Sequence, residues 1–457
     1  MIEVCPLETQ SLGDRSYLAH DGDVALVIDP QRDVDRIMNL AREERVRISH
    51  VAETHIHNDY VTGGVALAAA TGATYLVNAA DPVLFERTPV RDGDVLEIGA
   101  MRVRVVHTPG HTNTHLSYVL SEEDVPVAVF TGGSLLYGST GRSDLLGPDH
   151  TETLSHAQWR SVRMLADLLP DDTAVYPTHG FGSFCSVIQE DRTSSSIGRE
   201  KQTNPALTLT EEDYVRDFLA NLDAYPAYYA HMAPRNLAGP TEPDLSPPSV
   251  ADPEELQQRI EAGEWVVDLR HRSAFAAGHV MGTLNIGLDG QFVTYLGWLI
   301  PWGTPVTVLG DTADDVAAAQ RELVRIGIDR PAAMGTGGPA RWSGRAPLAA
   351  FPRVAFVDLA EVLQGSNPPT VLDVRRHVER SNAYIPGSIH IPIHETLGRL
   401  DDVPAGPVWV HCTSGYRASV AASILAAHGR DVVLVDDNFA VACQLGLAHT
   451  GVRPARS

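Results

Sequence analysis

Short apolar runs alternate with amphipathic stretches over the first half of this chain of 457 residues. The run DVALVIDP, residues 23–30, predicts a buried strand that ends in a turn, and residues 34–46 predict an amphipathic helix. Residues 48–55, ISHVAETH, predict a second strand that ends at a histidine. Later apolar runs also end in loops that carry histidine or glycine, which is how a sheet-based fold gathers a site from distant segments. The pattern predicts an α/β fold.

The second half of the chain contains two similar segments. A Pro-rich passage at 232–250 has little apolar periodicity and is interpreted as a linker. The segment WVVDLRHRSAFAAGHV from Trp265 is then echoed by TVLDVRRHVERSNAYI from Thr370. Two copies at such a long spacing indicate tandem domains, because solenoids use shorter units. We therefore expect three domains, at residues 1–235, 248–345 and 354–457.

Composition excludes several functional classes. A formal net charge of −23 argues against nucleic-acid binding and against docking on an anionic membrane. The N-terminal segment lacks the pattern of a secretory signal, and no apolar run approaches the length of a membrane span. The four cysteines are scattered and do not form a disulfide pattern. We expect a cytoplasmic protein with free thiols and with neither a nucleic-acid nor a membrane partner.

One cysteine of the third domain lies between a predicted strand and a predicted helix. Cys412 follows the strand VWV, and the helix is expected to start near Arg417. Loop N–H groups and the positive end of the helix dipole favour the thiolate, and the arginine adds a cation. The alternative is a small buried apolar side chain. The spacing predicts Cys412 and Arg417 as catalytic residues, and Thr413, Ser414, Gly415 and Tyr416 complete a cradle that suits a persulfide, sulfonate or phosphate.

This segment resembles the active loop of rhodanese sulfurtransferases over residues 350–457. The resemblance implies that Cys412 takes up sulfane sulfur as a persulfide, and that Asp373 and Arg375 form a structural ion pair. In the middle copy, Gly310 and Asp315 stand at the positions of the cysteine and of Arg417. That copy therefore resembles a non-catalytic rhodanese domain.

Several histidines lie at the ends of predicted strands in the first domain. Taken singly, each is explained as a surface or core histidine, but as a set in one domain they predict a metal site. The candidate ligands are His55, His57, Asp59, His111 and His179.

The blocks THIHNDY, TPGHT, FTGGSLLYGSTGRSD and PTHG resemble, in order, those of the metallo-β-lactamase fold. The resemblance implies an αββα metallo-β-lactamase sandwich, followed here by two rhodanese-like α/β domains. This combination most resembles the persulfide dioxygenase branch, in which two histidines and one carboxylate hold a single Fe(II). By position, those histidines are His55 and His111.

Two departures from the family pattern affect this site. Tyr60 replaces the last histidine of the first block, and Gly133 stands where the family carboxylate is expected. A further ligand would have to come from His57, Asp59 or His179, or from water. His115 is expected to be structural.

The leading hypothesis is an enzyme of sulfane-sulfur metabolism. It would oxidise a thiol persulfide such as glutathione persulfide to sulfite at one Fe(II) per chain, and Cys412 would pass sulfur to glutathione or sulfite. One alternative is a sulfurtransferase or sulfur carrier whose first domain is metal-poor and inactive, since Gly133 replaces the carboxylate. Another is a thioester hydrolase resembling glyoxalase II, which would need two metals, and both Tyr60 and Gly133 argue against it. Zinc in place of iron would point towards such hydrolysis. The resemblance also allows a homodimer.

Overall fold

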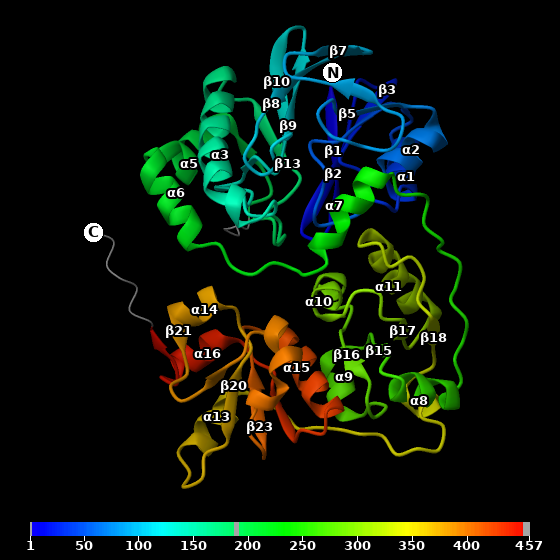
Figure 1. The fold of residues 1–457 in the computed structure, drawn as a ribbon, viewed down its shortest axis with the longest axis vertical. Helices are drawn as coiled ribbons and strands as arrows, with labels where there is room; N and C mark the ends of the chain where they lie inside the picture. Colours follow the sequence, from blue (N-terminus) through cyan, green and yellow to red (C-terminus); the bar gives the residue numbers. More distant parts are fainter. Residues whose placement is uncertain (1, 187–191, 451–457) are drawn as a thin grey trace. The chain divides into compact units, whose positions relative to one another are not determined.

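The computed structural model describes residues 2–186 and 192–450, and Figure 1 follows the chain through it. The chain divides into two compact units, residues 1–244 with 324–328 and the remainder from 245 onward. Each unit is built around its own sheets. Among the helices of the described residues, none combines the length and hydropathy that a membrane span needs.

The first unit contains two six-stranded sheets packed face to face. Side chains from both sheets, such as Leu26 and Phe130, meet in one buried cluster. The first sheet has the order β1-β2-β3-β4-β5-β6. Its strands are β1 (Glu3–Thr9), β2 (Asp14–His20), β3 (Val24–Ile28), β4 (Arg47–Ala52), β5 (Thr74–Asn78) and β6 (Thr88–Val90).

The second sheet has the order β14-β13-β10-β9-β8-β7. Its strands are β7 (Val95–Ile98), β8 (Met101–His107), β9 (Leu116–Glu122), β10 (Val125–Gly132), β13 (Ala174–Pro177) and β14 (Ser195–Ser196). A short hairpin, β11 (Leu135–Leu136) and β12 (Ser139–Thr140), follows β10.

Helices cover the outer face of each sheet. Apolar side chains of α1 and α2 pack on the first sheet, and those of α3 and α6 pack on the second. The helices are α1 (Asp35–Glu43), α2 (Gly64–Thr71), α3 (Pro148–Leu168), α4 (Ile197–Thr203), α5 (Pro205–Thr208), α6 (Glu211–Ala220) and α7 (Tyr229–Ala238). The predicted αββα sandwich is confirmed. The prediction that a linker begins at residue 232 was wrong, because helix α7 continues to Ala238.

The second unit contains two further sheets, in which the long strands run parallel. The first has the order β16-β15-β17-β18. Its elements are α8 (Pro253–Glu261), β15 (Trp265–Asp268), α9 (Arg272–Ala277), β16 (Leu284–Asn285), α10 (Phe292–Leu299), β17 (Val306–Leu309), α11 (Ala313–Arg325), β18 (Ala333–Gly335) and α12 (Pro339–Trp342).

The last sheet has the order β19-β24-β23-β20-β22. Its helices are α13 (Phe356–Leu363), α14 (His377–Asn382), α15 (Tyr416–Ala427) and α16 (Phe439–Gln444), with 3-10 turns at Ile393–Glu395 and Leu397–Asp402. Its strands are β19 (Arg353–Val354), β20 (Thr370–Asp373), β22 (Ile389–His390), β23 (Val408–His411) and β24 (Val432–Val435), and β21 (Ala383–Tyr384) pairs separately with β25 (His449–Thr450).

The two copies carry the same buried ion pair. Asp373, the last residue of β20, binds Arg375 at 2.7 Å, as predicted. Asp268, the last residue of β15, binds Arg270 at 2.6 Å in the middle copy. Because each carboxylate is buried, its guanidinium partner is needed to offset the cost of burying a charge. The shared pair supports the interpretation of these segments as repeats of one fold.

Candidate metal centre and sulfur-transfer loop

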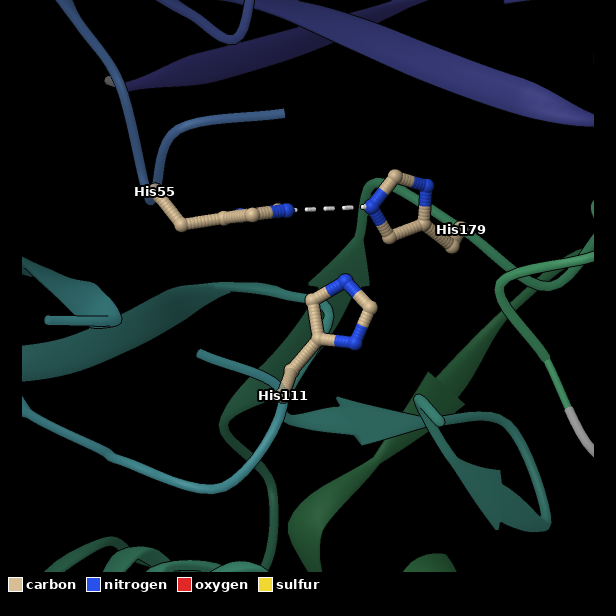
Figure 2. Close-up of side chains that lie close together, drawn as sticks. All are labelled: His55, His111 and His179. Carbon is tan, nitrogen blue, oxygen red and sulfur yellow. Dashed lines mark hydrogen bonds between the residues drawn. The ribbon is translucent and has the colours of Figure 1, made fainter. Parts of the chain in front are cut away.

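The loops that carry the candidate ligands follow strands that end at the same edge of the sandwich. His55 lies after β4, His111 after β8, Gly133 after β10 and His179 after β13. The sequence predicts a site gathered from such strand ends, and the structure brings the three histidines together. Figure 2 shows their rings pointing into one shared space.

Asp29, at the end of β3, ties these loops together. Its carboxylate accepts hydrogen bonds from the Thr54 backbone N–H and hydroxyl, both at 2.7 Å, and from the Thr178 hydroxyl. Thr54 precedes His55 and Thr178 precedes His179. One buried carboxylate therefore fixes the position of two of the three histidines.

The Nδ1 atom of each histidine has its own hydrogen-bond partner. His111 Nδ1 lies 2.7 Å from the Arg142 carbonyl oxygen, and His179 Nδ1 lies 2.8 Å from Asp14 Oδ1. His55 Nδ1 lies 2.9 Å from the Thr54 hydroxyl oxygen, whose proton is donated to Asp29. These partners accept hydrogen bonds, so each Nδ1 carries a proton and Nε2 is the nitrogen through which each ring can bind a cation.

The three Nε2 atoms converge. His55 Nε2 lies 3.4 Å from His179 Nε2, and one ligand atom from each of the three residues lies within 4.8 Å of the others. His111 Nε2 is buried and has no hydrogen-bond partner among the described residues. Buried polar atoms are rarely left unpartnered, so this arrangement is typical of a cation site. Three histidines with one open position are a known ligand set for a divalent ion.

The three histidine rings differ in the direction in which their surroundings shift the pKa. Burial and the neighbouring imidazoles lower the pKa of His55 well below its usual value, and burial with His179 lowers the pKa of His111 to about 3. Both rings are therefore neutral, as metal ligands must be. Burial alone would lower the pKa of His179, but Asp59 and Asp14 raise it well above its usual value. A metal ion would displace that proton.

His57 lies beside this cluster with its Nε2 engaged by other groups, whereas its Nδ1 is buried and has no hydrogen-bond partner among the described residues. Its Nε2 is 3.3 Å from Asp29, 3.2 Å from Glu53 and 3.0 Å from the Tyr60 hydroxyl. Burial alone would lower the pKa of His57, but Asp29 and Glu53 raise it to about 9. The Tyr60 ring also stacks on this imidazole with ring centroids 4.3 Å apart. A protonated imidazole thus neutralises two buried carboxylates in this position.

Asp59 lies on the other side of the cluster, where its Oδ2 is 3.1 Å from His179 Nδ1. It orients His179 together with Asp14. His57, Asp59 and His179 also lie close enough to form a second candidate group for a metal ion, and so do Asp29, Glu53 and His57.

Gly133 leaves room for the His111 ring. A Cβ atom added to this glycine would lie 2.2 Å from His111 Cδ2 and 2.7 Å from its Nε2. The imidazole therefore occupies space that a side chain at position 133 would need. The residues present do not fit a site of two histidines and a carboxylate at position 133, but they fit one divalent ion held by His55, His111 and His179.

His115 has a structural role in this geometry, as expected. Its Nδ1 lies 2.8 Å from the Thr108 hydroxyl, and its Nε2 accepts a hydrogen bond from the Gly133 N–H at 3.0 Å. Both ring nitrogens are used, so no lone pair remains for a metal ion.

Two residues near the site gave no recognisable signal in the sequence. Asn236 of α7 donates to the carbonyl oxygens of His57 and Tyr60 at 2.9 and 2.8 Å and accepts from the Thr62 N–H at 2.9 Å. Arg142 offers its carbonyl oxygen to His111, and Asp144 holds its guanidinium at 2.6 and 2.7 Å. Backbone acceptors leave no trace in side-chain patterns.

In the second unit, Cys412 lies between β23 and α15, and its side chain is buried. The Gly415 N–H points at Cys412 Sγ from 3.2 Å. Gly415 has a φ of 88°, a backbone conformation that favours glycine, and it immediately precedes the helix. The predicted loop therefore curls around the sulfur with the helix N-terminus behind it, where an anionic sulfur is stabilised.

Arg417 is held by a carboxylate that sequence analysis did not identify. Its guanidinium makes two hydrogen bonds to Glu379 of α14, at 2.6 and 2.7 Å, and a third to the Thr413 hydroxyl at 2.9 Å. Ser414 offers its carbonyl oxygen to Arg272 of the middle copy, and the Tyr416 hydroxyl donates to the Gly287 carbonyl at 2.8 Å.

Comparisons with known proteins agree with this architecture. Residues 15–179 match the model of the Metallo-beta-lactamase superfamily, and residues 252–345 and 357–441 match the model of the Rhodanese-like domain. A crystal structure of a metallo-beta-lactamase from Staphylococcus aureus is similar with a TM-score of 0.66 and 28% identity, covering 73% of this chain and 99% of that one.

A persulfide dioxygenase and a hydrolase are among the curated relatives that match the first half of the chain. The human mitochondrial persulfide dioxygenase ETHE1 is 29% identical over 217 residues, which cover 47% of this chain and 76% of that protein. A hydroxyacylglutathione hydrolase of Cereibacter sphaeroides is 29% identical over 224 residues, which cover 45% of this chain and 82% of that protein. The chain therefore combines an N-terminal domain of the metallo-β-lactamase fold with two C-terminal rhodanese domains.

Proposed function

We propose that this protein transfers sulfane sulfur through a persulfide on Cys412. The observation that carries the proposal is the Gly415 N–H at 3.2 Å from Cys412 Sγ, at the start of α15. An N–H donor and a helix N-terminus stabilise the thiolate and, after sulfur uptake, the persulfide anion. The rhodanese match over residues 357–441 supports the same chemistry.

The reaction consists of two successive displacements on sulfur, in which atoms and charges balance. The Cys412 thiolate attacks the outer sulfur of a donor persulfide, R–S–S⁻. The S–S bond of the donor breaks, the thiolate RS⁻ leaves, and Cys412 carries the new S–S bond. A thiolate or sulfite then attacks the outer sulfur of this persulfide, and the Cys412 thiolate returns as the leaving group. No oxidant is consumed.

For the first domain, we propose one divalent ion held by His55, His111 and His179, and oxidation of a thiol persulfide to sulfite there if the ion is Fe(II). The bound ion would supply open coordination positions for a thiol persulfide and O2. The chain itself holds the three Nε2 atoms together through Thr54, the Arg142 carbonyl and Asp14. The resemblance to a human persulfide dioxygenase supports this reaction.

Hydrolysis of a glutathione thioester is the second candidate for the same centre. Three neutral histidines with an open position suit zinc, which activates water, and a hydroxyacylglutathione hydrolase is among the similar proteins. A two-metal form is disfavoured, because Tyr60 and the protonated His57 occupy the space near Asp29 and Glu53.

Cys412→Ser tests the sulfur-transfer proposal. We expect mass spectrometry to show one added sulfur atom on the wild-type protein after incubation with glutathione persulfide, and none at position 412 of the variant. Cys443→Ser is the matched control, because Cys443 is exposed in the same domain. Equal transfer rates in a folded Cys412→Ser protein would overturn the proposal.

Elemental analysis tests the metal proposal. We expect about one metal ion per chain in anaerobically purified wild type and a loss of it in the double variant His55→Ala, His111→Ala. Iron together with oxygen uptake on glutathione persulfide would support oxidation, and zinc with turnover of S-D-lactoylglutathione would support hydrolysis. An unchanged metal content in the double variant would refute the site.

A further inference from the structure

The arginines beside the Cys412 loop are paired with carboxylates. The guanidinium of Arg417 donates two hydrogen bonds to the carboxylate of Glu379, at 2.6 and 2.7 Å. Arg272, which reaches the loop from the middle copy, binds Asp436 and Asp289, each at 2.6 Å. Both arginines therefore have an anionic partner within hydrogen-bond distance, which weakens the positive field that they would otherwise produce at the loop.

Glu379 is the central member of this network. Besides Arg417, its carboxylate accepts a hydrogen bond from the Thr413 hydroxyl at 2.6 Å, so it reaches the loop residue next to Cys412, and it also pairs with Arg376 at 3.4 Å. Its side chain is only 23% exposed. Burial alone would raise the pKa of Glu379, but Arg417 and Thr413 hold it well below its usual range. The carboxylate is therefore ionised at neutral pH.

Sulfane-sulfur donors differ in the charge that they bring to this loop. Thiosulfate carries two negative charges on a small ion, whereas the reacting end of a thiol persulfide carries one. The Gly415 N–H and the helix N-terminus can stabilise a single charge on sulfur. A second charge next to Cys412 would need a cation, and the one on Arg417 is already neutralised by Glu379.

We propose that Glu379 sets the donor specificity of Cys412, by neutralising Arg417 so that the loop takes a thiol persulfide in preference to thiosulfate. This inference rests on the sulfur transfer proposed above. Glu379 acts through Arg417 and is a positioning residue. With thiosulfate, the Cys412 thiolate would attack the outer sulfur, the S–S bond would break, and sulfite would leave.

Glu379→Gln tests the inference, because it removes the charge and keeps the size of the side chain. We measure kcat/KM for thiosulfate and for glutathione persulfide with one common acceptor. The ratio of thiosulfate to persulfide is expected to rise by about tenfold in the variant, which corresponds to ~1.4 kcal/mol. A purely structural role would lower both constants and leave their ratio unchanged.

Two matched variants sharpen the result. Glu379→Asp keeps the charge and is expected to keep the wild-type ratio. Glu395→Gln removes another glutamate of the same domain, paired with Arg399 at 2.8 Å, and is expected to change neither constant. If Glu379→Gln does not fold, the inference is tested on the wild-type protein, by measuring kcat/KM for thiosulfate at increasing ionic strength. If Glu379 offsets the charge of Arg417, the kcat/KM for thiosulfate depends only weakly on ionic strength. A steep decrease of this constant with added salt overturns the inference.

The remaining outcomes separate this inference from the proposed function. Sulfur on Cys412 with an unchanged donor ratio in Glu379→Gln overturns the role of Glu379 alone. Absence of sulfur on wild-type Cys412 with either donor overturns the sulfur transfer, and the inference with it.

Discussion

Replacement of Gly133 by alanine would test how the metal centre is built. The added Cβ would lie 2.2 Å from His111 Cδ2, and ordinary contact begins at 3.4 Å, so the ring must move by about 1.2 Å (3.4 − 2.2). Metal–ligand distances tolerate only ~0.2 Å. We therefore expect Gly133→Ala to remove His111 from the ligand set and to weaken metal binding by at least about 10- to 100-fold. In the metal-free protein, overpacking is expected to cost about 1–3 kcal/mol.

Titration of the metal-free protein with Zn²⁺, followed by competition with a chelator, gives the affinity. Urea unfolding of the same samples gives the stability. Gly398→Ala is the matched control, because an added Cβ there meets no atom within 4 Å. Wild-type zinc affinity in Gly133→Ala would refute the reasoning, since it would mean that His111 does not hold the ion in this position.

The remaining predictions concern buried polar groups that neighbour the two sites. Burial lowers the pKa of His411 to about 4, below the ordinary value of ~6.5, so stability is lost progressively as the pH falls from ~6.5 to about 4, because the unfolded chain then binds a proton that the folded chain does not. His411→Phe is expected to remove up to about 3 kcal/mol of that acid sensitivity, and equal pH dependence of urea unfolding in both proteins would contradict this. Asn236→Ala should lower the free energy of unfolding by about 2–4 kcal/mol, because it strands three backbone groups, and should weaken zinc binding. Asn221→Ala, at an exposed asparagine, should change neither the free energy of unfolding nor zinc binding. Identical unfolding curves for the two variants would disprove that Asn236 holds the loop of His57 and Tyr60 in place.

The fold was largely predictable because its signals are local. Apolar runs such as that of β3, in which all five residues are buried, marked strands directly. The repeat from Trp265 to Thr370 marked the duplicated domains, and Gly415 and Arg417 after a strand marked the loop around Cys412.

The ligand set could not be fixed in the same way, because it depends on contacts between distant residues. His179 was one of several candidates until Asp14, 165 residues earlier, was found to fix the proton on its Nδ1. The acceptor for His111 is a backbone carbonyl, which any residue could supply. Glu379 precedes its partner Arg417 by 38 residues in an ordinary polar helix. Such pairings follow from the tertiary fold rather than from local pattern.

Hydrogen bonds between the two rhodanese copies have a consequence for how the protein is made. Ser419 and Ser423 of α15, the helix behind Cys412, bond to the side-chain oxygen and the backbone N–H of Asn285 at 2.7 and 2.9 Å. During synthesis, the middle copy leaves the ribosome before the third and can fold first. It then offers a finished surface against which α15 can dock. The repeat without a thiol would thus act as a template, and a third domain expressed by itself would expose polar groups that the full chain buries.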